Sequence, residues 1–409
     1  MRLKCFSNTI NPINLVSFLI GYSGLMIYFS WDDNFNMQVI FPIMIVVIGS
    51  FFYKNNFRVP YVSDFKYFAS ILAAYFISLL SGFIFNNDAI NELALVRTIY
   101  SGLILLYYVV AVNFCIDNRF VKTIISGNLL AGTLTAVLVI KNWLAGAGGK
   151  VSLLNYWGNA VEENYTAAFV AFTTILCLVI YFTSNDYRIK FIAFCSASIN
   201  TFAIFLTGSR AAFVALIMSS LVLLIIYIFT DKTSINKKIF IICVSILLGI
   251  YFITNILNIL PEFIYNRLFI NSLNDNSNRE RIMLWSLALE GFLYRPIFGY
   301  GAGVFSYYVQ KEFPHHIVVV AHNTLIDFLV DFGIIGIALL TLLFYKNIYV
   351  CFTKRGFCLF PLLICWFITS FIVGGERTFF FWNGLITITI LCKFVKQSKE
   401  GLITIWNKK

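Results

Sequence analysis

The chain has 409 residues, of which 60% are hydrophobic and only 12% are charged. A soluble domain would carry about 25% charged residues, so a water-soluble fold is excluded and the apolar excess must face lipid. The formal net charge of +11 does not indicate nucleic-acid binding, because the basic residues form short clusters between apolar runs, as they do in cytoplasmic loops.

The apolar runs are about 17–24 residues long, enough to cross a ~30 Å hydrocarbon layer as helices. They predict an all-α fold, a polytopic helical membrane bundle in which residues 1–409 form a single membrane domain. The first run is read as a retained span, because Trp31, Asp32 and Asp33 follow it in place of a small-residue cleavage site. We expect about twelve transmembrane helices, over residues 12–30, 37–53, 65–85, 93–116, 121–143, 165–183, 190–206, 210–229, 239–258, 323–345, 357–373 and 378–395.

Alternate connections between these spans differ in charge. Most of the 30 basic residues fall in one set of connections, which includes both chain ends, and few acidic residues accompany them. The positive-inside rule therefore predicts that both termini are cytoplasmic, and that the number of spans is even. No disulfide is expected, because the cysteines lie in apolar spans or on the basic side of the membrane.

Two connections are long, and both are predicted to lie on the outer face. Residues 144–164 form a smaller, glycine-rich loop, and residues 259–321 form a large loop between the ninth and tenth spans. Long ordered loops are uncommon without a function. Within the larger loop, residues 282–294 carry apolar side chains at helical spacing, which predicts a short interfacial helix. The Gly299-Tyr-Gly301-Ala-Gly303 run has no strand before it, so we read it as a tight turn and not as a dinucleotide motif.

Ionisable residues gather near the predicted outer face, where charge in a span commonly marks a site. Arg210 follows the short Thr207-Gly208-Ser209 turn and opens a span, an arrangement suited to binding an anion such as phosphate. An arginine or lysine near a span end can also simply extend to the headgroups, and this reading is favoured for Lys141 and Arg377. The ionisable residues near this face are Arg97, Lys141, Arg210, Asp327, Asp331 and Arg377.

The large outer loop adds Arg267, Arg279, Arg281 and Arg295. Arg279 and Arg281 flank Glu280 and stand just before Trp285, where the interfacial helix is expected. A solvated loop can carry arginines without a function, but the planar guanidinium binds phosphate or pyrophosphate bidentately. At a lipid boundary, these arginines suggest a polyanionic headgroup as the ligand.

All three histidines lie close together, as His315, His316 and His322. Asp327 or Asp331 could add a carboxylate ligand, but the histidine spacing matches no recognised metal site, so we predict no metal. His322 stands directly before Asn323, where the loop enters the tenth span, and it can accept a proton from a hydroxyl group. The alternative is that His322 is a helix-entry histidine bonded to the backbone, and this reading is favoured for His315 and His316.

Several short motifs follow one another along the second half of the chain. They are Asn164-Tyr-Thr-Ala-Ala, Thr207-Gly-Ser-Arg210-Ala-Ala, Arg281-x3-Trp285, Pro296-Ile-Phe-Gly299-Tyr-Gly301-Ala-Gly303-Val-Phe305, His322-Asn323-Thr-Leu325 and Gly333-Ile-Ile-Gly336. In their order, spacing and predicted membrane side, these motifs resemble the O-antigen ligase/polymerase superfamily of bacterial membrane glycosyltransferases. The similarity covers roughly residues 160–345.

The resemblance implies an inverting glycosyltransferase in the bacterial inner membrane that uses no metal or other cofactor. Its donor would be a glycan on undecaprenyl pyrophosphate, and its active site would lie at the periplasmic face. Carried over residue by residue, the resemblance implies that Arg210 and Arg281 bind the pyrophosphate and that His322 activates the acceptor hydroxyl. No motif assigns Arg279 a role equal to that of Arg281, and we expect it only to assist; Asn164, Trp285, Asn323 and Asp327 are expected to support the site.

Two activities within this superfamily fit the sequence. A ligase joins O-antigen to lipid A-core, whereas a polymerase extends a growing glycan. The ligase is favoured because the long loop ends in His322-Asn323, and because the smaller loop contains Lys150 but no arginine. A transporter or flippase for a lipid-linked or anionic solute is the alternative of another class. It predicts ionisable residues near the membrane midplane, which the positions of the charges do not favour.

Overall fold

A computed structural model of the chain describes residues 12–23, 37–54, 92–114, 117–146, 163–230, 276–301, 321–373 and 379–398, with short pieces elsewhere. These residues are almost entirely helical. The helices are α1 (Pro12–Tyr22), α2 (Met37–Lys54), α4 (Glu92–Val112), α5 (Asn118–Leu144), α6 (Glu163–Thr183), α7 (Tyr187–Thr207), α8 (Arg210–Thr230), α11 (Asn276–Tyr294), α13 (Thr324–Cys351), η3 (Phe357–Leu359), α14 (Phe360–Val373) and α15 (Phe379–Gln397).

The prediction of a helical membrane protein is confirmed. Within the described residues, α5, α6, α7, α8 and α13 are long and apolar enough to span a bilayer, and α1, α2, α4 and the η3–α14 segment contribute shorter apolar helices. The total of twelve spans stays a prediction, because residues 65–85 and 239–258 lie largely outside the described part of the chain. A small hairpin, β1 (Leu153–Leu154) with β2 (Ala160–Val161), was not predicted, and it pairs Leu153 with Val161.

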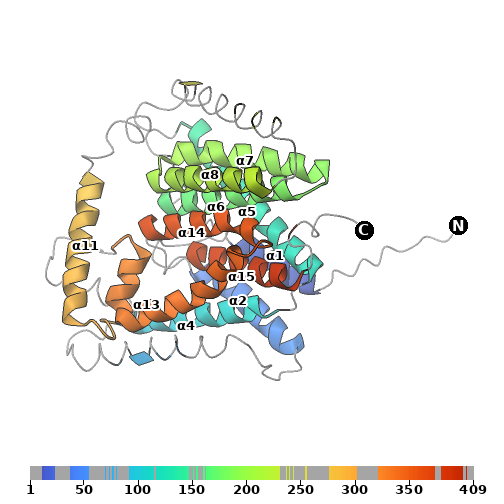
Figure 1. The fold of residues 1–409 in the computed structure, drawn as a ribbon. Helices are drawn as coiled ribbons and strands as arrows, with labels where there is room; N and C mark the ends of the chain where they lie inside the picture. The colour runs from blue at the N-terminus through green and yellow to red at the C-terminus, as the bar shows by residue number, and fades with distance from the viewer. Residues whose placement is uncertain are drawn as a thin grey trace.

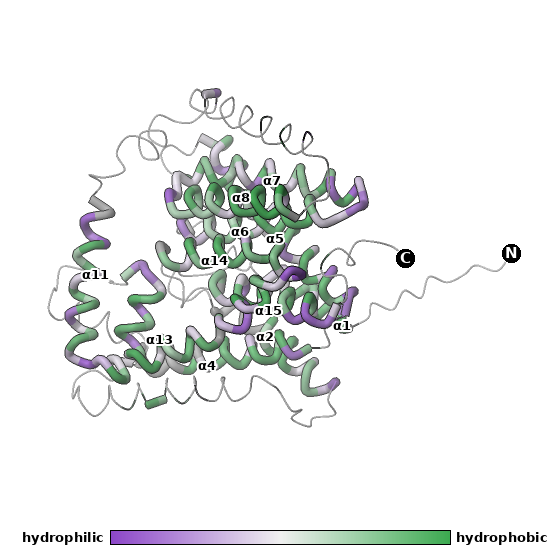
Figure 2. The backbone as a smooth tube through the Cα atoms, viewed as in Figure 1, coloured by the Kyte–Doolittle hydropathy of each residue, from purple (hydrophilic) through white to green (hydrophobic). Residues whose placement is uncertain are grey.

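Helices α5, α6, α7, α8 and α14 run side by side, and α11 lies across one end of this bundle (Figure 1). Apolar residues follow the lengths of the bundle helices, while polar residues gather at their ends (Figure 2). Helix starts agree with simple capping chemistry. Asp117 accepts a hydrogen bond from the backbone N–H of Phe120 at α5, and Asp186 does so from Arg188 at α7.

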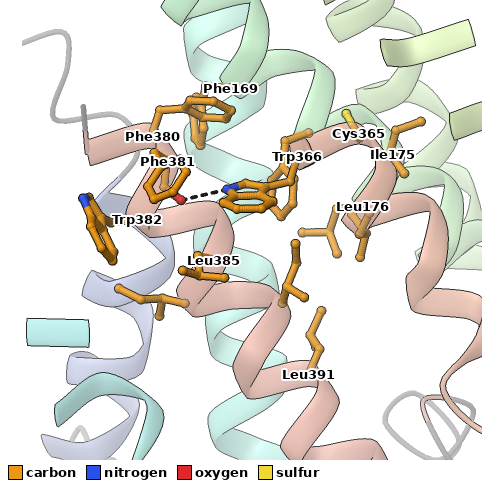
Figure 3. Packing of buried hydrophobic residues seen from close by; sticks show 14 of the residues in the cluster. Phe169, Ile175, Leu176, Cys365, Trp366, Phe380, Phe381, Trp382, Leu385 and Leu391 are labelled. Atoms are coloured by element: carbon orange, nitrogen blue, oxygen red, sulfur yellow. Dashed lines mark hydrogen bonds between the residues drawn. The ribbon is translucent and has the colours of Figure 1, made fainter. Parts of the chain in front are cut away.

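The interior is filled by aromatic and aliphatic side chains. Trp366 of α14 lies among Phe344 and Phe381, and its indole N–H donates to the carbonyl of Phe381 over 2.9 Å (Figure 3). That bond satisfies the indole N–H, the one polar group of the tryptophan side chain, which would otherwise be buried without a partner. Elsewhere, Gly21 of α1 and Gly127 of α5 allow backbone-to-backbone approach, since a Cβ on either would meet backbone of the other helix.

Polar side chains link α15 to its neighbours within this apolar interior. Asn128 of α5 donates to Thr387 over 3.2 Å and accepts from Asn383 over 3.3 Å. Further along α15, Thr389 accepts a hydrogen bond from Asn347 of α13 over 2.8 Å and lies 3.1 Å from the hydroxyl of Tyr108 of α4. Such bonds hold membrane helices together, at roughly 0.6 kcal/mol each.

Helix α13 is broken near its start, which changes the expectation of one continuous span over residues 323–345. Gly333 has φ 65° and ψ −163°, a conformation that does not belong to a helix. The part before Gly333 runs alongside α11, and the part after it turns into the bundle (Figure 1). Asp327 and Asp331 therefore precede the break, in the part of α13 that runs alongside α11 (Figure 1).

Candidate functional site

Arg210 is the first residue of α8, and a tight turn from α7 determines its position. The turn is possible because Gly208 ends α7 in the left-handed conformation, with φ 63°, which costs glycine little. Ser209 is 1% exposed, and its hydroxyl donates to the side-chain oxygen of Asn164 over 2.9 Å. Asn164 opens α6, so this bond joins the start of α6 to the turn before Arg210. Arg210 itself is half-buried.

The smaller predicted loop is attached to the same place. The backbone N–H of Val151 donates to the carbonyl of Leu206, in the last turn of α7, over 3.2 Å, and Val151 is fully buried. The β1–β2 hairpin follows Val151 directly and precedes Asn164. The loop is therefore attached beside the turn that carries Arg210 at two points, Val151 and Asn164.

A second group of predicted residues forms where α11 meets the start of α13. The helix predicted over residues 282–294 exists and begins earlier, at Asn276. Trp285 of α11 donates its indole N–H to the carbonyl of Ala321 over 2.6 Å. Arg281 is half-buried one helical turn before Trp285. Residues four apart on a helix are neighbours on one face, so Arg281 lies beside the residue that contacts the start of α13.

His322 has an unusual backbone conformation, with φ 51°, and among the described residues it alone combines a positive φ with a side chain. A left-handed conformation is uncommon for residues other than glycine, and strained residues of this kind cluster at functional sites. The residue on each side is anchored. Asn323 caps α13 by accepting from the N–H groups of Leu325 and Ile326. Ala321 donates its N–H to a carboxylate oxygen of Asp327 over 2.9 Å.

The predicted glycine turn lies against the break in α13. The N–H groups of Tyr300 and Gly301 donate to the carbonyls of Val330 and Asp331 over 2.9 and 2.8 Å. In the other direction, the N–H of Ile334 donates to the carbonyl of Pro296 over 2.9 Å. The turn thus satisfies backbone groups that the break would leave without helical partners. The sequence predicted the tight turn, but not that it contacts α13.

Helix α14 connects the two groups of residues. It packs against α8, with Ser219 beside the thiol of Cys365. The two helices are antiparallel. At ~1.5 Å per residue, Arg210 therefore lies about 14 Å from the level of Ser219 and Cys365, and Phe371 lies about 9 Å from it in the same direction. The ring of Phe371 makes an edge contact with Trp285, with centroids 6.5 Å apart. Arg210 therefore lies at the same end of the bundle as Trp285, Arg281 and His322.

The remaining predicted residues have different positions. Arg279 is exposed near the start of α11, and Lys141 is exposed near the end of α5. Sequence reasoning missed one contact: Arg295 lies over the ring of Tyr300, 4.6 Å from its centroid. Several predicted positions lie outside the described residues, or have side chains that do, namely Arg97, Arg267, His315, His316, Gly303 and Arg377.

Residues 191–341 match the family model described as O-antigen ligase. The matched region begins in α7 and ends in α13, and it contains Arg210, α11 and the His322-Asn323 entry to α13. No curated protein matches the chain.

Proposed function

Because residues 191–341 match the O-antigen ligase family model, we propose that the chain transfers an undecaprenyl-pyrophosphate-linked glycan to a hydroxyl of lipid A-core. The observation that carries the proposal is that Arg210, Arg281 and the strained His322 lie at the same end of the helical bundle. This reaction needs cationic side chains that bind the pyrophosphate, and a basic nitrogen that accepts the proton of the acceptor hydroxyl.

In the proposed reaction, His322 removes the proton from the acceptor hydroxyl as its oxygen attacks the anomeric carbon. The bond from that carbon to the pyrophosphate oxygen breaks, and undecaprenyl pyrophosphate leaves with the bonding electrons. Attack from the side opposite the leaving group inverts the configuration. Arg210 and Arg281 stabilise the negative charge that develops on the pyrophosphate, a role that in other enzymes is often taken by a metal ion. Arg279, exposed at the start of α11, assists in binding the donor.

We place this site at the periplasmic face of the inner membrane, with both termini in the cytoplasm. The α6–α7 connection supports this orientation. It lies at the end of the bundle opposite to α11 (Figure 1), and Arg188 and Lys190 follow it in the first turn of α7. Basic residues at that end and the candidate site at the other agree with the positive-inside rule. The polyprenyl tail reaches the site laterally from the bilayer.

The experiment is complementation of a deletion strain, with extracted lipopolysaccharide separated on a gel. Wild type, Arg281→Ala and His322→Asn are compared, with Lys141→Ala as a control because Lys141 is exposed at the end of α5. Asparagine tolerates the left-handed conformation better than alanine does, so His322→Asn removes the imidazole without adding backbone strain. Protein abundance in the membrane is measured for each variant.

We expect Lys141→Ala to restore polymer on the lipid core, while Arg281→Ala and His322→Asn do not. Glycan accumulating on the carrier lipid would support the ligase. A core that carries one repeat unit in the deletion strain would identify a polymerase instead. Normal lipopolysaccharide from His322→Asn would show that His322 is not the base.

A further inference from the structure

Nothing within His322 explains its left-handed backbone. Histidine can adopt φ 51°, but an unrestrained chain would favour the extended or right-handed regions. Such a conformation persists only when the surrounding structure enforces it. The question is therefore which contacts enforce it, and whether these contacts serve the chemistry assigned to His322.

The contacts converge on Ala321, the residue before His322. Ala321 is fully buried, and side chains from two different helices bind its two backbone groups. Trp285 of α11 donates to its carbonyl over 2.6 Å, and Asp327 of α13 accepts from its N–H over 2.9 Å. Asp327 is itself only 3% exposed. Breaking either bond would leave a buried backbone group unsatisfied, so both bonds are strongly favoured.

The residue after His322 is held by α13 itself. Asn323 is fully buried and caps the helix, and its own carbonyl accepts the N–H of Asp327 over 2.9 Å. Asp327 thus binds the chain on both sides of His322, through its carboxylate to Ala321 and through its backbone to Asn323. With both neighbours held, the backbone of His322 has little freedom, so these contacts limit where its imidazole can lie.

We propose that Trp285 and Asp327 are positioning residues, which hold Ala321 between α11 and α13 so that the imidazole of His322 meets the acceptor hydroxyl. This inference rests on the proposed function. It adds that Asp327 acts through the oxygen that accepts the Ala321 N–H, and that Trp285 acts through its indole N–H. It also makes α11, which carries Arg281, part of the support for His322.

The test is a kinetic comparison of purified variants with a polyprenyl-pyrophosphate-linked glycan as donor and lipid A-core as acceptor. Asp327→Ala removes the accepting oxygen, whereas Asp327→Asn keeps an oxygen there and removes only the charge. Trp285→Phe keeps an aromatic ring against Phe371 and removes the N–H. Ser286→Ala is the matched control, because Ser286 is exposed on α11 and its hydroxyl donates to the carbonyl of Met283 in the same helix.

We expect Asp327→Ala and Trp285→Phe to lower kcat by about 10- to 100-fold, as small misplacements of a catalytic group do. The KM for the donor should stay within about twofold, because Arg210 and Arg281 are unchanged. Asp327→Asn should retain most of the activity, and Ser286→Ala all of it. If Asp327→Ala does not fold, Trp285→Phe still tests the inference.

Two results would overturn the inference while leaving the proposed function intact. One is wild-type kcat in both Trp285→Phe and Asp327→Ala, with His322→Asn inactive. The other is an equal loss in Asp327→Asn and Asp327→Ala, which would assign the effect to the charge of Asp327 and not to its hydrogen bond. Full activity of His322→Asn would instead overturn the proposed function and this inference together.

Discussion

The break in α13 at Gly333 gives the sharpest stability prediction. Gly333 has φ 65° and ψ −163°, a combination that is essentially restricted to glycine. A Cβ at this position would also collide with the carbonyl group of Ile297 and the backbone nitrogen of Phe298. Gly333→Ala must therefore change the backbone of α13, the turn beside it, or both.

The size of the effect follows from what the collision disturbs. Forcing alanine into this conformation costs about 1–3 kcal/mol. Moving the turn away weakens the bond from Ile334 to Pro296 and the longer one from Ile335 to Ile297, which measure 2.9 and 3.4 Å. Each such bond contributes about 0.5–1.5 kcal/mol net. We expect Gly333→Ala to destabilise the protein by about 2–5 kcal/mol, a large part of a typical folding stability.

Two other glycines provide graded controls. Gly49 is exposed within α2, and a Cβ there would meet nothing within 4 Å, so Gly49→Ala should be neutral or slightly stabilising. Gly146 has φ 87° but is equally open, so Gly146→Ala should incur conformational strain alone, about 1–2 kcal/mol. Gly333→Ala combines strain with collision.

The assay is heating of the detergent-solubilised protein, fused to a fluorescent protein, followed by size-exclusion chromatography. Because unfolding of such a protein is commonly irreversible, the temperature at half loss of the monodisperse peak is compared at one heating time. The expected order is Gly49→Ala and wild type highest, then Gly146→Ala, then Gly333→Ala. If Gly333→Ala survives as well as Gly146→Ala, the collision with the turn is not a real constraint, and the reasoning fails.

Three further predictions concern other parts of the chain. Gly127→Leu should separate α1 from α5 and lower the same half-loss temperature more than Gly49→Leu does, because a side chain at Gly127 meets backbone of α1. Asn128→Leu should remove bonds to Thr387 and Asn383 and destabilise by about 1–2 kcal/mol, measured in the same assay; no loss would show that these bonds contribute nothing net. Alkaline phosphatase fused within residues 144–164 should be active in cells, while a fusion at the C-terminus should be inactive; the reverse pattern would contradict the assigned orientation.

Much of the fold could be predicted because the bilayer imposes a simple rule. Each apolar run long enough to cross it becomes a helix, so the ranges of α5 to α8 follow from hydropathy alone. The break in α13 could not be predicted that way. Gly333 lies within a continuous apolar run, and glycine is common inside membrane helices. What distinguishes it is the Pro296–Gly301 turn, whose contact with α13 is not encoded in local sequence.

In the candidate site, too, some features could be predicted from the sequence and others could not. Arg210 could be singled out because the Gly208-Ser209 turn is short and polar, and Trp285 and His322 because a family pattern contains them. Their contacts could not be foreseen. The bond from Ser209 to Asn164 joins segments 45 residues apart, and the bond from Trp285 to Ala321 joins segments 36 residues apart. Sequence pattern identifies the residue types, but only packing shows which of them meet.

The break in α13 also accounts for two acidic residues that would otherwise be costly. A straight α13 of 28 residues would be about 42 Å long, against a hydrocarbon layer of ~30 Å. After Gly333, the remaining segment to Cys351 is about 27 Å long and contains no acidic residue. Asp327 and Asp331 precede the break, where backbone N–H groups of the Ala321 and Gly301 segments bind the Asp327 side chain and the Asp331 carbonyl. An unbroken helix would carry Asp331 toward the hydrocarbon, so the glycine that breaks α13 is what permits acidic residues so close to the proposed base.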